Sequence, residues 1–108
     1  MTLKLRQLDQ MEDFQAVYNV IMDGQDYAMI VNGEPPAQKD VANFFTDIAP
    51  GKTSNDMLKL GIEENGDFIG IVGIAQNFPE NHIWHIGLLM LHSSRRNKGI
   101  GRYVIQRI

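Results

Sequence analysis

Apolar positions at the start of the chain recur with two different periods. Residues 3–8 alternate between apolar and polar side chains, which predicts a short strand whose end is indistinct. In residues 11–22 the apolar positions recur every three or four residues, which predicts a helix ending near Gly24. Asp9, followed three residues later by Glu12, is typical of a capping box before this helix. The apolar face of the predicted helix consists of Met11, Phe14, Tyr18, Ile21 and Met22.

The next segment predicts a second helix after an ambiguous stretch. Residues 26–33 fit neither period, and Pro35–Pro36 would stop any helix there. Residues 37–48 again show helical spacing, with Val41, Phe44, Phe45 and Ile48 on one face.

A β-hairpin is the clearest prediction in the middle of the chain. Residues 50–56 form a polar connection, and residues 57–63 then alternate in character. Residues 68–75 are a second strand-like run. Asn65–Gly66 lies between the two runs, and this dipeptide favours a tight turn in which both central residues have positive φ.

A third strand and a terminal helix complete the pattern. Residues 78–81 favour another turn, which leads into a strand over residues 82–91. From Ile86 onward this strand is apolar on both faces, which predicts a central strand buried on both sides. Residues 103–108 have helical spacing. The predicted order is therefore β-α-α-β-β-β-α.

Composition narrows the class of protein. A chain of 108 residues is one domain at most, and 44% hydrophobic residues are enough for a packed core. A net charge of −3 argues against nucleic acid as a general partner. The sequence has no cysteine, no secretory leader and no run long enough to span a membrane, so we expect a cytoplasmic protein without a membrane partner.

A basic, glycine-bearing segment at residues 94–102 follows the last predicted strand and opens the last predicted helix. The first N–H groups of a helix lack intrahelical partners, and the helix dipole favours anions there. Glycine removes side chains that would keep an anion away from such donors. The segment therefore predicts a phosphate or pyrophosphate site, although a solvated basic loop is the alternative. Its glycines and cations are Gly99, Gly101, Arg95, Arg96, Lys98 and Arg102.

Two familiar phosphate motifs are excluded by spacing. A Walker motif ending in Gly51-Lys52-Thr53 would need a glycine where the chain has Thr46. A dinucleotide-binding motif starting at Gly99 would need a glycine where the chain has Val104.

The segment does contain the pattern R-x-x-G-x-G, at residues 96–101, directly between a strand and a helix. In this setting it resembles the acyl-CoA signature of the GNAT superfamily of N-acetyltransferases. Further segments resemble that family in the same order: residues 32–36, 49–52, 60–62, 69–71, 78–80 and 84–89. The resemblance implies an α+β, three-layer fold in which helices flank a mixed, mostly antiparallel sheet. It also implies an enzyme that transfers an acetyl group from acetyl-CoA to a primary amine of a small molecule or protein.

The resemblance assigns residues to the cosubstrate and requires no metal. It implies that backbone groups of Leu89, Met90 and Leu91 pair with the pantetheine arm of acetyl-CoA. The backbone amides of Asn97, Lys98, Gly99, Ile100, Gly101 and Arg102 would hold the pyrophosphate. Arg96 would order the loop or add to its charge.

The acceptor side is less specified. By the same resemblance the first two helices form a wall of the acceptor site, which makes Tyr27, Met29 and Phe45 candidate neighbours of the substrate. The candidates for a general base are His82, His85, Glu63 and Glu64. No catalytic residue is assigned among them.

Members of the family usually continue past the position of Ile108 with further strands and a helix. We therefore expect residues 1–108 to be a single incomplete domain, or one whose missing part is supplied by another chain. The open strand edge would favour such association. A catalytically silent acyl-CoA-binding protein and an interaction module remain alternatives to the enzyme.

Overall fold

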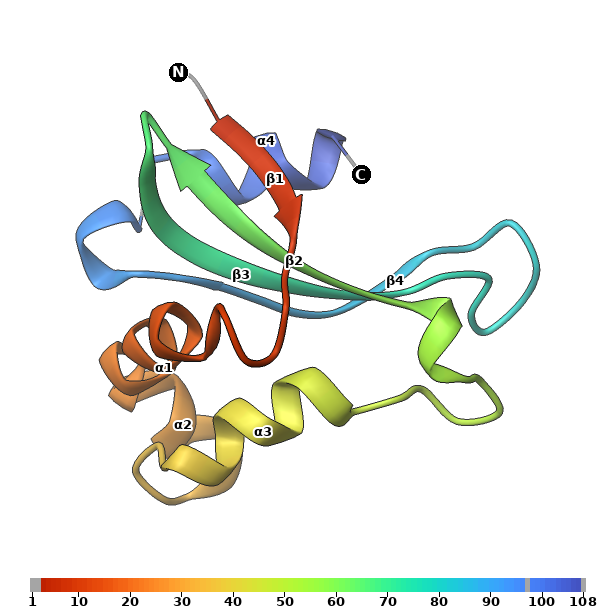
Figure 1. Cartoon of the computed structure of the whole chain (residues 1–108), viewed down its shortest axis with the longest axis horizontal. Helices are drawn as coiled ribbons and strands as arrows, with labels where there is room; N and C mark the ends of the chain where they lie inside the picture. Colours follow the sequence, from red (N-terminus) through yellow and green to blue (C-terminus); the bar gives the residue numbers. More distant parts are fainter. Residues whose placement is uncertain (1–2, 97, 108) are drawn as a thin grey trace.

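The computed structural model describes residues 3–96 and 98–107, except for the side chains of Tyr27, Val31 and Asn32 (Figure 1). Short 3-10 turns at Ser54–Asp56 and Ser93–Arg95 supplement the longer elements. In chain order these elements are β1 (Leu3–Gln7), α1 (Phe14–Asp23), α2 (Gln25–Asn32), α3 (Gln38–Thr46), β2 (Met57–Glu64), β3 (Asp67–Ala75), β4 (His85–Leu91) and α4 (Ile100–Arg107).

The strands form one antiparallel sheet in the order β1-β2-β3-β4. The predicted hairpin between β2 and β3 is confirmed, because Asn65 and Gly66 have φ values of 52° and 90°. Both values lie in the left-handed region that a tight two-residue turn requires. The α+β fold predicted from the sequence is confirmed.

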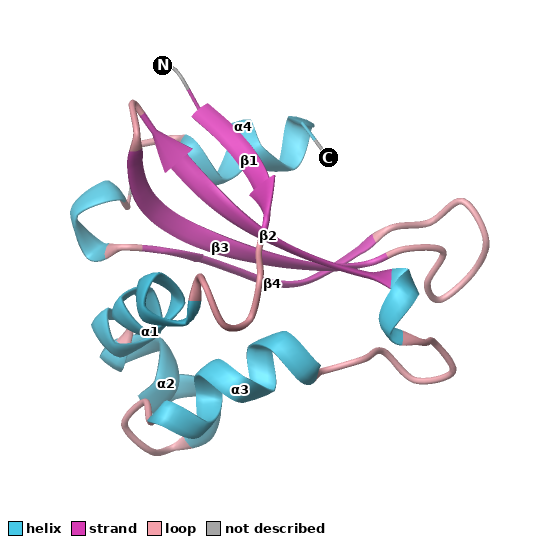
Figure 2. Cartoon of the chain, in the orientation of Figure 1, coloured by secondary structure: helices cyan, strands magenta, loops and turns pink. Residues whose placement is uncertain are grey.

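Helices cover both faces of the sheet, which gives three layers (Figure 2). On one face α1 and α3 bury Val17, Val20, Val41 and Phe44 against Ile71 of β3 and Met90 of β4. On the other face α4 buries Ile100 and Val104 against Ile62, Val72 and Ile74. The sheet therefore holds the start of α4 and the end of α1 on opposite sides of β4.

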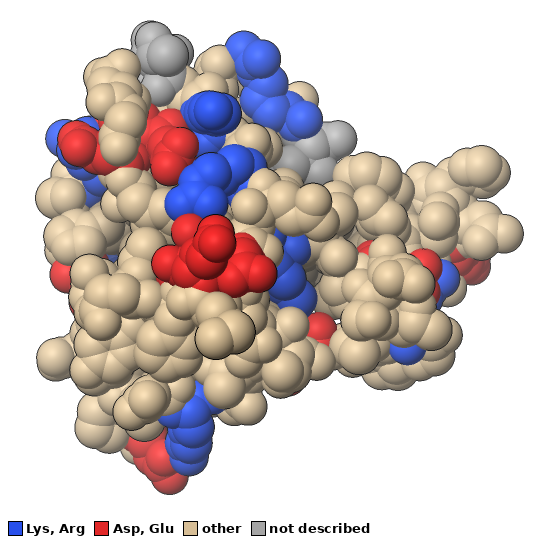
Figure 3. All heavy atoms as spheres, viewed as in Figure 1, with Lys and Arg blue, Asp and Glu red and all other residues tan. Residues whose placement is uncertain are grey.

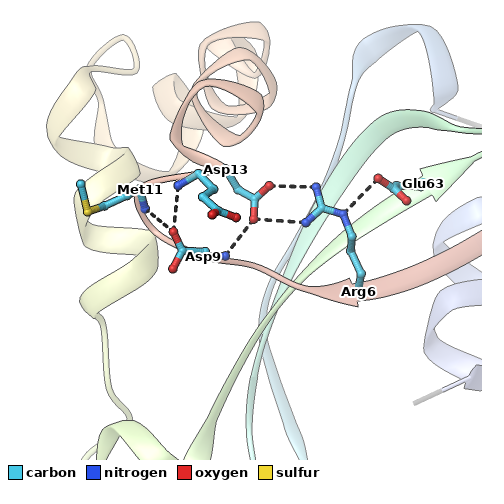
Figure 4. Close-up of polar contacts among 6 residues, drawn as sticks. Arg6, Asp9, Met11, Asp13 and Glu63 are labelled. Carbon is cyan, nitrogen blue, oxygen red and sulfur yellow. Dashed lines mark hydrogen bonds and ion pairs between the residues drawn. The ribbon is translucent and has the colours of Figure 1, made fainter.

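A polar network joins β1 to the start of α1 (Figure 4). Arg6 donates two hydrogen bonds to the carboxylate of Asp13 and one to Glu63 of β2. Asp9 accepts from the backbone N–H groups of Met11 and Glu12, and its own N–H donates to Asp13. The predicted capping box thus has Asp13, rather than Glu12, as its reciprocal carboxylate.

The helices differ from the sequence prediction in two places. Residues 10–13 form a turn because Asp9 ties up their backbone, so α1 begins at Phe14 and Met11 is 88% exposed. The ambiguous stretch is helix α2, which begins directly after Gly24 and ends before Gly33, a residue in the left-handed conformation at φ 70°. Three helices therefore separate β1 from β2, instead of two.

The predicted burial of the last strand on both sides is not seen among the described residues. Within the described residues β4 is an edge strand that pairs with β3 alone, and Met90 is its one buried residue. The central, buried strand is β3, in which every residue from Ile69 to Ala75 is buried. The strand also begins at His85, later than the predicted start at His82, which has φ 70°.

Candidate functional site

Strand β4 carries a β-bulge at Gly87. Gly73 of β3 pairs with Leu88, but the next residue, Ile74, pairs with Ile86, so Gly87 has no partner in the register. A bulge bends its strand and increases its twist locally, and bulges are common beside active sites. The glycine at position 87, alone among the apolar residues 86–91, was the signal available in the sequence, because an isolated glycine within a strand often marks a bulge.

Beyond the bulge, the free edge of β4 offers the backbone groups of Leu89 and Leu91. The N–H of His92 donates to Ile69 of β3 at 2.7 Å, so residue 92 faces the sheet. Backbone groups alternate in direction along an antiparallel strand, which turns Met90 toward β3 and Leu89 and Leu91 away from it. Consistently, Arg96 Nε donates to the carbonyl of Leu91 at 3.2 Å.

The basic loop and the start of α4 follow directly. Gly99 has φ 76°, a conformation that favours glycine, and its carbonyl accepts the N–H of Tyr103 at 3.1 Å. The N–H groups of Ile100, Gly101 and Arg102 are in the first turn of α4 and have no intrahelical acceptor. The side chain of Ile100 is buried in the core, so its backbone alone faces the loop. Asn97, another predicted site residue, lies outside the described residues.

The four cations of the segment have different environments. Arg95 pairs with Glu64 and with Asp67, at the end of the β2–β3 hairpin. Arg96 pairs with Asp26 of α2 at 3.1 Å. Lys98 and Arg102 are exposed and form no ion pair within the part of the chain that the structure describes. On the face in Figure 3, basic side chains lie beside acidic ones rather than in one broad patch.

The loop between β4 and α4 is hydrogen-bonded to α1, which covers the face of the sheet opposite to α4. Asp23, the last residue of α1, accepts two hydrogen bonds from Ser93, and His92 Nε2 lies 3.5 Å from the same carboxylate. Burial opposes ionisation of Asp23, but the bonds from Ser93 hold its pKa below the usual range. Figure 1 shows this loop beside α1.

Two cavities, of about 350 and 310 Å³, lie between β4 and α3 and meet at the bulge. They share Phe44, Asp47, Gly87 and Leu88 as lining residues. The first extends toward β2 and the start of β4, where it is also lined by Met57, Lys59, Gly73, Phe78 and His85. The second extends toward α1 and α2, where it is also lined by Ile21, Ala28, Asp40, Asn43 and Met90.

The structure separates the four base candidates. His85 lines the first cavity and packs edge-on against Phe78, with ring centroids 5.7 Å apart. His82 is exposed in the β3–β4 loop. Glu63 and Glu64 are engaged by Arg6 and Arg95 and do not line either cavity.

Two of the predicted neighbours of the acceptor, Met29 and Phe45, are not among the residues that line the two cavities. Phe45 lies against a separate hollow beside Ser54, while its neighbour Phe44 lines both cavities at the bulge. Met29 is exposed and is not among the residues that line either cavity. The side chain of Tyr27 lies outside the described part. Sequence reasoning missed Lys59, Asp47 and Gly87; a lysine inside an apolar strand was the signal available for the first.

Comparison with known proteins decides the family. Residues 14–108 match the model of the acetyltransferase (GNAT) family. The chain belongs to this family. Acyl transfer is therefore the general reaction of the family to which this chain belongs. The resemblance inferred from residues 96–101 is confirmed. No curated protein matches the sequence.

Solved structures agree with the fold. An acetyltransferase from Thermus thermophilus superimposes with a TM-score of 0.80 at 18% identity, over 99% of this chain and 67% of that one. A GNAT family acetyltransferase from Staphylococcus aureus gives 0.64 at 21% identity, over 99% and 75%. The PaiA N-acetyltransferase from Thermoplasma acidophilum, solved in complex with coenzyme A, gives 0.59 at 16% identity, over 99% and 69%.

The described residues provide neither a membrane-spanning helix nor a metal-binding cluster. None of the helices in residues 3–96 and 98–107 is both long and apolar enough to cross a membrane. The same residues contain no cluster of three or more His, Cys, Asp or Glu side chains suited to a metal ion.

Proposed function

We propose that this GNAT chain binds acetyl-CoA along the free edge of β4 and transfers the acetyl group to a primary amine of a small molecule or protein, in the cytoplasm. The observation that carries the proposal is two sets of backbone groups, one on β4 that faces away from β3 and one in the first turn of α4 that has no intrahelical acceptor. The first set consists of the backbone groups of Leu89 and the N–H of Leu91, whose carbonyl accepts from Arg96. The second consists of the N–H groups of Ile100, Gly101 and Arg102.

These two sets fit the two chemically distinct parts of the cosubstrate. The amide groups of a pantetheine arm can pair with Leu89 and Leu91 as a neighbouring strand would. The pyrophosphate suits the start of α4, where Lys98 and Arg102 are exposed and unpaired among the described residues. A Cβ atom added to Gly101 would lie 3.7 Å from Leu89 Cδ2, so this glycine lies next to Leu89 of β4.

The chain's own residues would then position the reaction at the bulge. Acetyl-CoA supplies an activated thioester, and the protein must hold it beside a deprotonated amine. The cavities on either side of Gly87 offer space for that amine between Phe44 and Leu88. Imidazoles exchange protons near neutral pH, so we propose His85, in the wall of the first cavity, as the proton acceptor.

Two measurements test this function. Calorimetric titration of the protein with coenzyme A should show saturable binding of one molecule per chain. Release of the free thiol from acetyl-CoA should then depend on an added amine, in a panel of small amines and lysine-containing peptides. Absence of coenzyme A binding would overturn the proposal, and binding without turnover would favour a catalytically silent acyl-CoA-binding protein.

A second candidate role is association of two copies through β4. An unpaired strand edge presents a row of backbone donors and acceptors to another chain, and β4 has such an edge within the described residues. The same groups would bind the pantetheine arm, so the two roles compete. Sedimentation with and without coenzyme A distinguishes them, because the cosubstrate should dissociate a dimer held by this edge.

A further inference from the structure

Lys59 places a positive charge inside the first cavity. It comes from the middle of β2 and is half-buried beneath the end of α3. Its Nζ donates to the backbone carbonyl of Asp47 at 3.1 Å and lies 5.2 Å from the centroid of the Phe44 ring. Burial lowers the pKa of this ammonium, an effect that the charge of Asp47 partly offsets. A cation is costly in such a place unless it has partners.

The ammonium lies close to the bulge. A Cβ atom added to Gly73 would lie 3.5 Å from Phe44 Cε1, 3.9 Å from Lys59 Nζ and 4.0 Å from Leu88 Cβ. Gly73 pairs with Leu88, the residue directly after Gly87. The absence of a side chain at Gly73 therefore leaves a space bordered by the ammonium, an aromatic ring and the bulged strand.

A purely structural role would use only some of the hydrogen-bond donors of the Lys59 ammonium. Lysines near the last carbonyls of a helix stabilise its negative end, and Asp47 directly follows α3. An ammonium has three N–H donors, however, and among the described residues the carbonyl of Asp47 accepts only one of them. The remaining donors are free for an anionic group that enters the cavity.

Taken with the proposed transferase function, on which it rests, this geometry points to the class of acceptor. We propose that the acceptor amine carries a carboxylate a few bonds from its nitrogen, as an amino acid does, and that Lys59 binds this carboxylate. The amine would then lie beside Gly87, where the two cavities meet. Asp47, exposed at the rim of both cavities, complements the positive charge that such an acceptor carries before transfer.

Matched acceptors test the proposal. Amino acids, their primary amides and their decarboxylated amines are compared by thiol release from acetyl-CoA. We expect kcat/KM to be about tenfold or more higher for the carboxylates, which is the scale of one charge-assisted hydrogen bond. Lys59→Met should remove this preference and Lys59→Arg should keep most of it. Lys39→Met, on the exposed surface of α3, is the matched control and should leave it unchanged. A loss of stability alone would not alter the preference.

A second variant and a binding measurement keep the outcome decisive. Gly73→Ala retains the lysine but adds a methyl group in front of it, at ordinary contact distances, and should weaken use of the carboxylates. If coenzyme A binds but no acceptor turns over, amide signals of Gly73 and Gly87 are followed by NMR as each acceptor is added. Shifts with the carboxylates alone, lost in Lys59→Met, would support the proposal. Equal responses to all members of a set would overturn it while leaving the transferase function intact. Failure to bind coenzyme A would instead overturn the function on which it rests.

Discussion

The carboxylate of Asp23 binds Ser93, a residue 70 positions later, through both the backbone N–H at 2.6 Å and the hydroxyl at 3.0 Å. An ion pair between Asp26 and the guanidinium of Arg96 also joins these two parts of the chain. The junction of α1 and α2 therefore fixes the loop that precedes α4. Helices α1 and α2, which border the second cavity, are therefore bonded directly to the loop that leads to the proposed pyrophosphate site.

Removing the Asp23–Ser93 bridge should weaken cosubstrate binding without altering the donors themselves. In Asp23→Ala the loop loses two hydrogen bonds and the nearby charge of the carboxylate, so its donors spend less time in the binding geometry. We expect the dissociation constant for coenzyme A, measured by calorimetry, to rise by about tenfold, corresponding to one charge-assisted hydrogen bond. Glu80→Ala, in the exposed β3–β4 loop, is the control. Equal affinities for the two variants would show that the bridge does not position the loop.

The contribution of main-chain donors is tested at Gly101. The two methyl groups of valine would lie at the first turn of α4, between its N–H groups and Leu89 of β4. Because a Cβ atom at this position meets Leu89 at an ordinary 3.7 Å, the fold should tolerate the change. We expect Gly101→Val to abolish coenzyme A binding in calorimetry while the thermal midpoint changes little. Retained binding in a folded Gly101→Val protein would contradict the main-chain model.

Arg95 should be nearly irrelevant to the cosubstrate despite its place in the basic segment. Its guanidinium is already paired with Glu64 and Asp67, at the end of the β2–β3 hairpin. We expect Arg95→Ala to change coenzyme A affinity by no more than about twofold and to lower the free energy of unfolding by about 1 kcal/mol, as for a partly exposed ion pair. Urea denaturation and calorimetry on the same preparation give the two values. An affinity loss as large as that in Gly101→Val would require Arg95 to leave its partners for the ligand.

Local signals in the sequence were sufficient for several elements. Asn65–Gly66 specified the β2–β3 hairpin because few other residues tolerate positive φ in both central positions. The strand, glycine loop and helix order was predicted correctly, although α4 begins at Ile100, within the glycine motif, rather than at the predicted residue 103. These features depend on contacts within a few residues, so the sequence carries them directly.

The errors came from contacts between distant residues. The start of α1 depends on Arg6 and Asp13, and a helical pattern that includes Met11 contains no trace of that ion pair. The cavity residue Lys59 and the bulge at Gly87 are brought together by the pairing of β2, β3 and β4. The sequence pattern gives the faces of each strand but not the register between strands, so the position of these two residues beside the same cavity could not be recognised in advance.

The Arg6 network predicts how stability responds to acid. Hydrogen bonds from Arg6 are the main cause that lowers the pKa of Asp13 below its ordinary value of 3.8. A carboxyl group with a lowered pKa stabilises the fold fully above the unfolded value, and this contribution is lost as pH falls through the folded value. We expect Asp13→Asn to be less stable than the parent by about 1–2 kcal/mol at pH 7. The difference, from urea denaturation, should shrink below about pH 4. A difference that stayed constant down to pH 2 would show that the charge of Asp13 is not what stabilises the junction.

Two glycines of β3 should respond oppositely to the same substitution. A Cβ atom at Gly70 would lie 2.6 Å from the backbone carbonyl oxygen of Met90 and 2.8 Å from Leu91 Cδ2, so β3 and β4 would have to separate. We expect Gly70→Ala to lower the free energy of unfolding by about 1–3 kcal/mol, which is typical of overpacking. At Gly73 the nearest atoms are 3.5 Å or more away, so Gly73→Ala should be neutral or slightly stabilising. Denaturant midpoints of the two variants give the comparison. Equal destabilisation would mean that β3 requires glycine for its backbone conformation, and that the space in front of Lys59 is not the reason for a glycine at position 73.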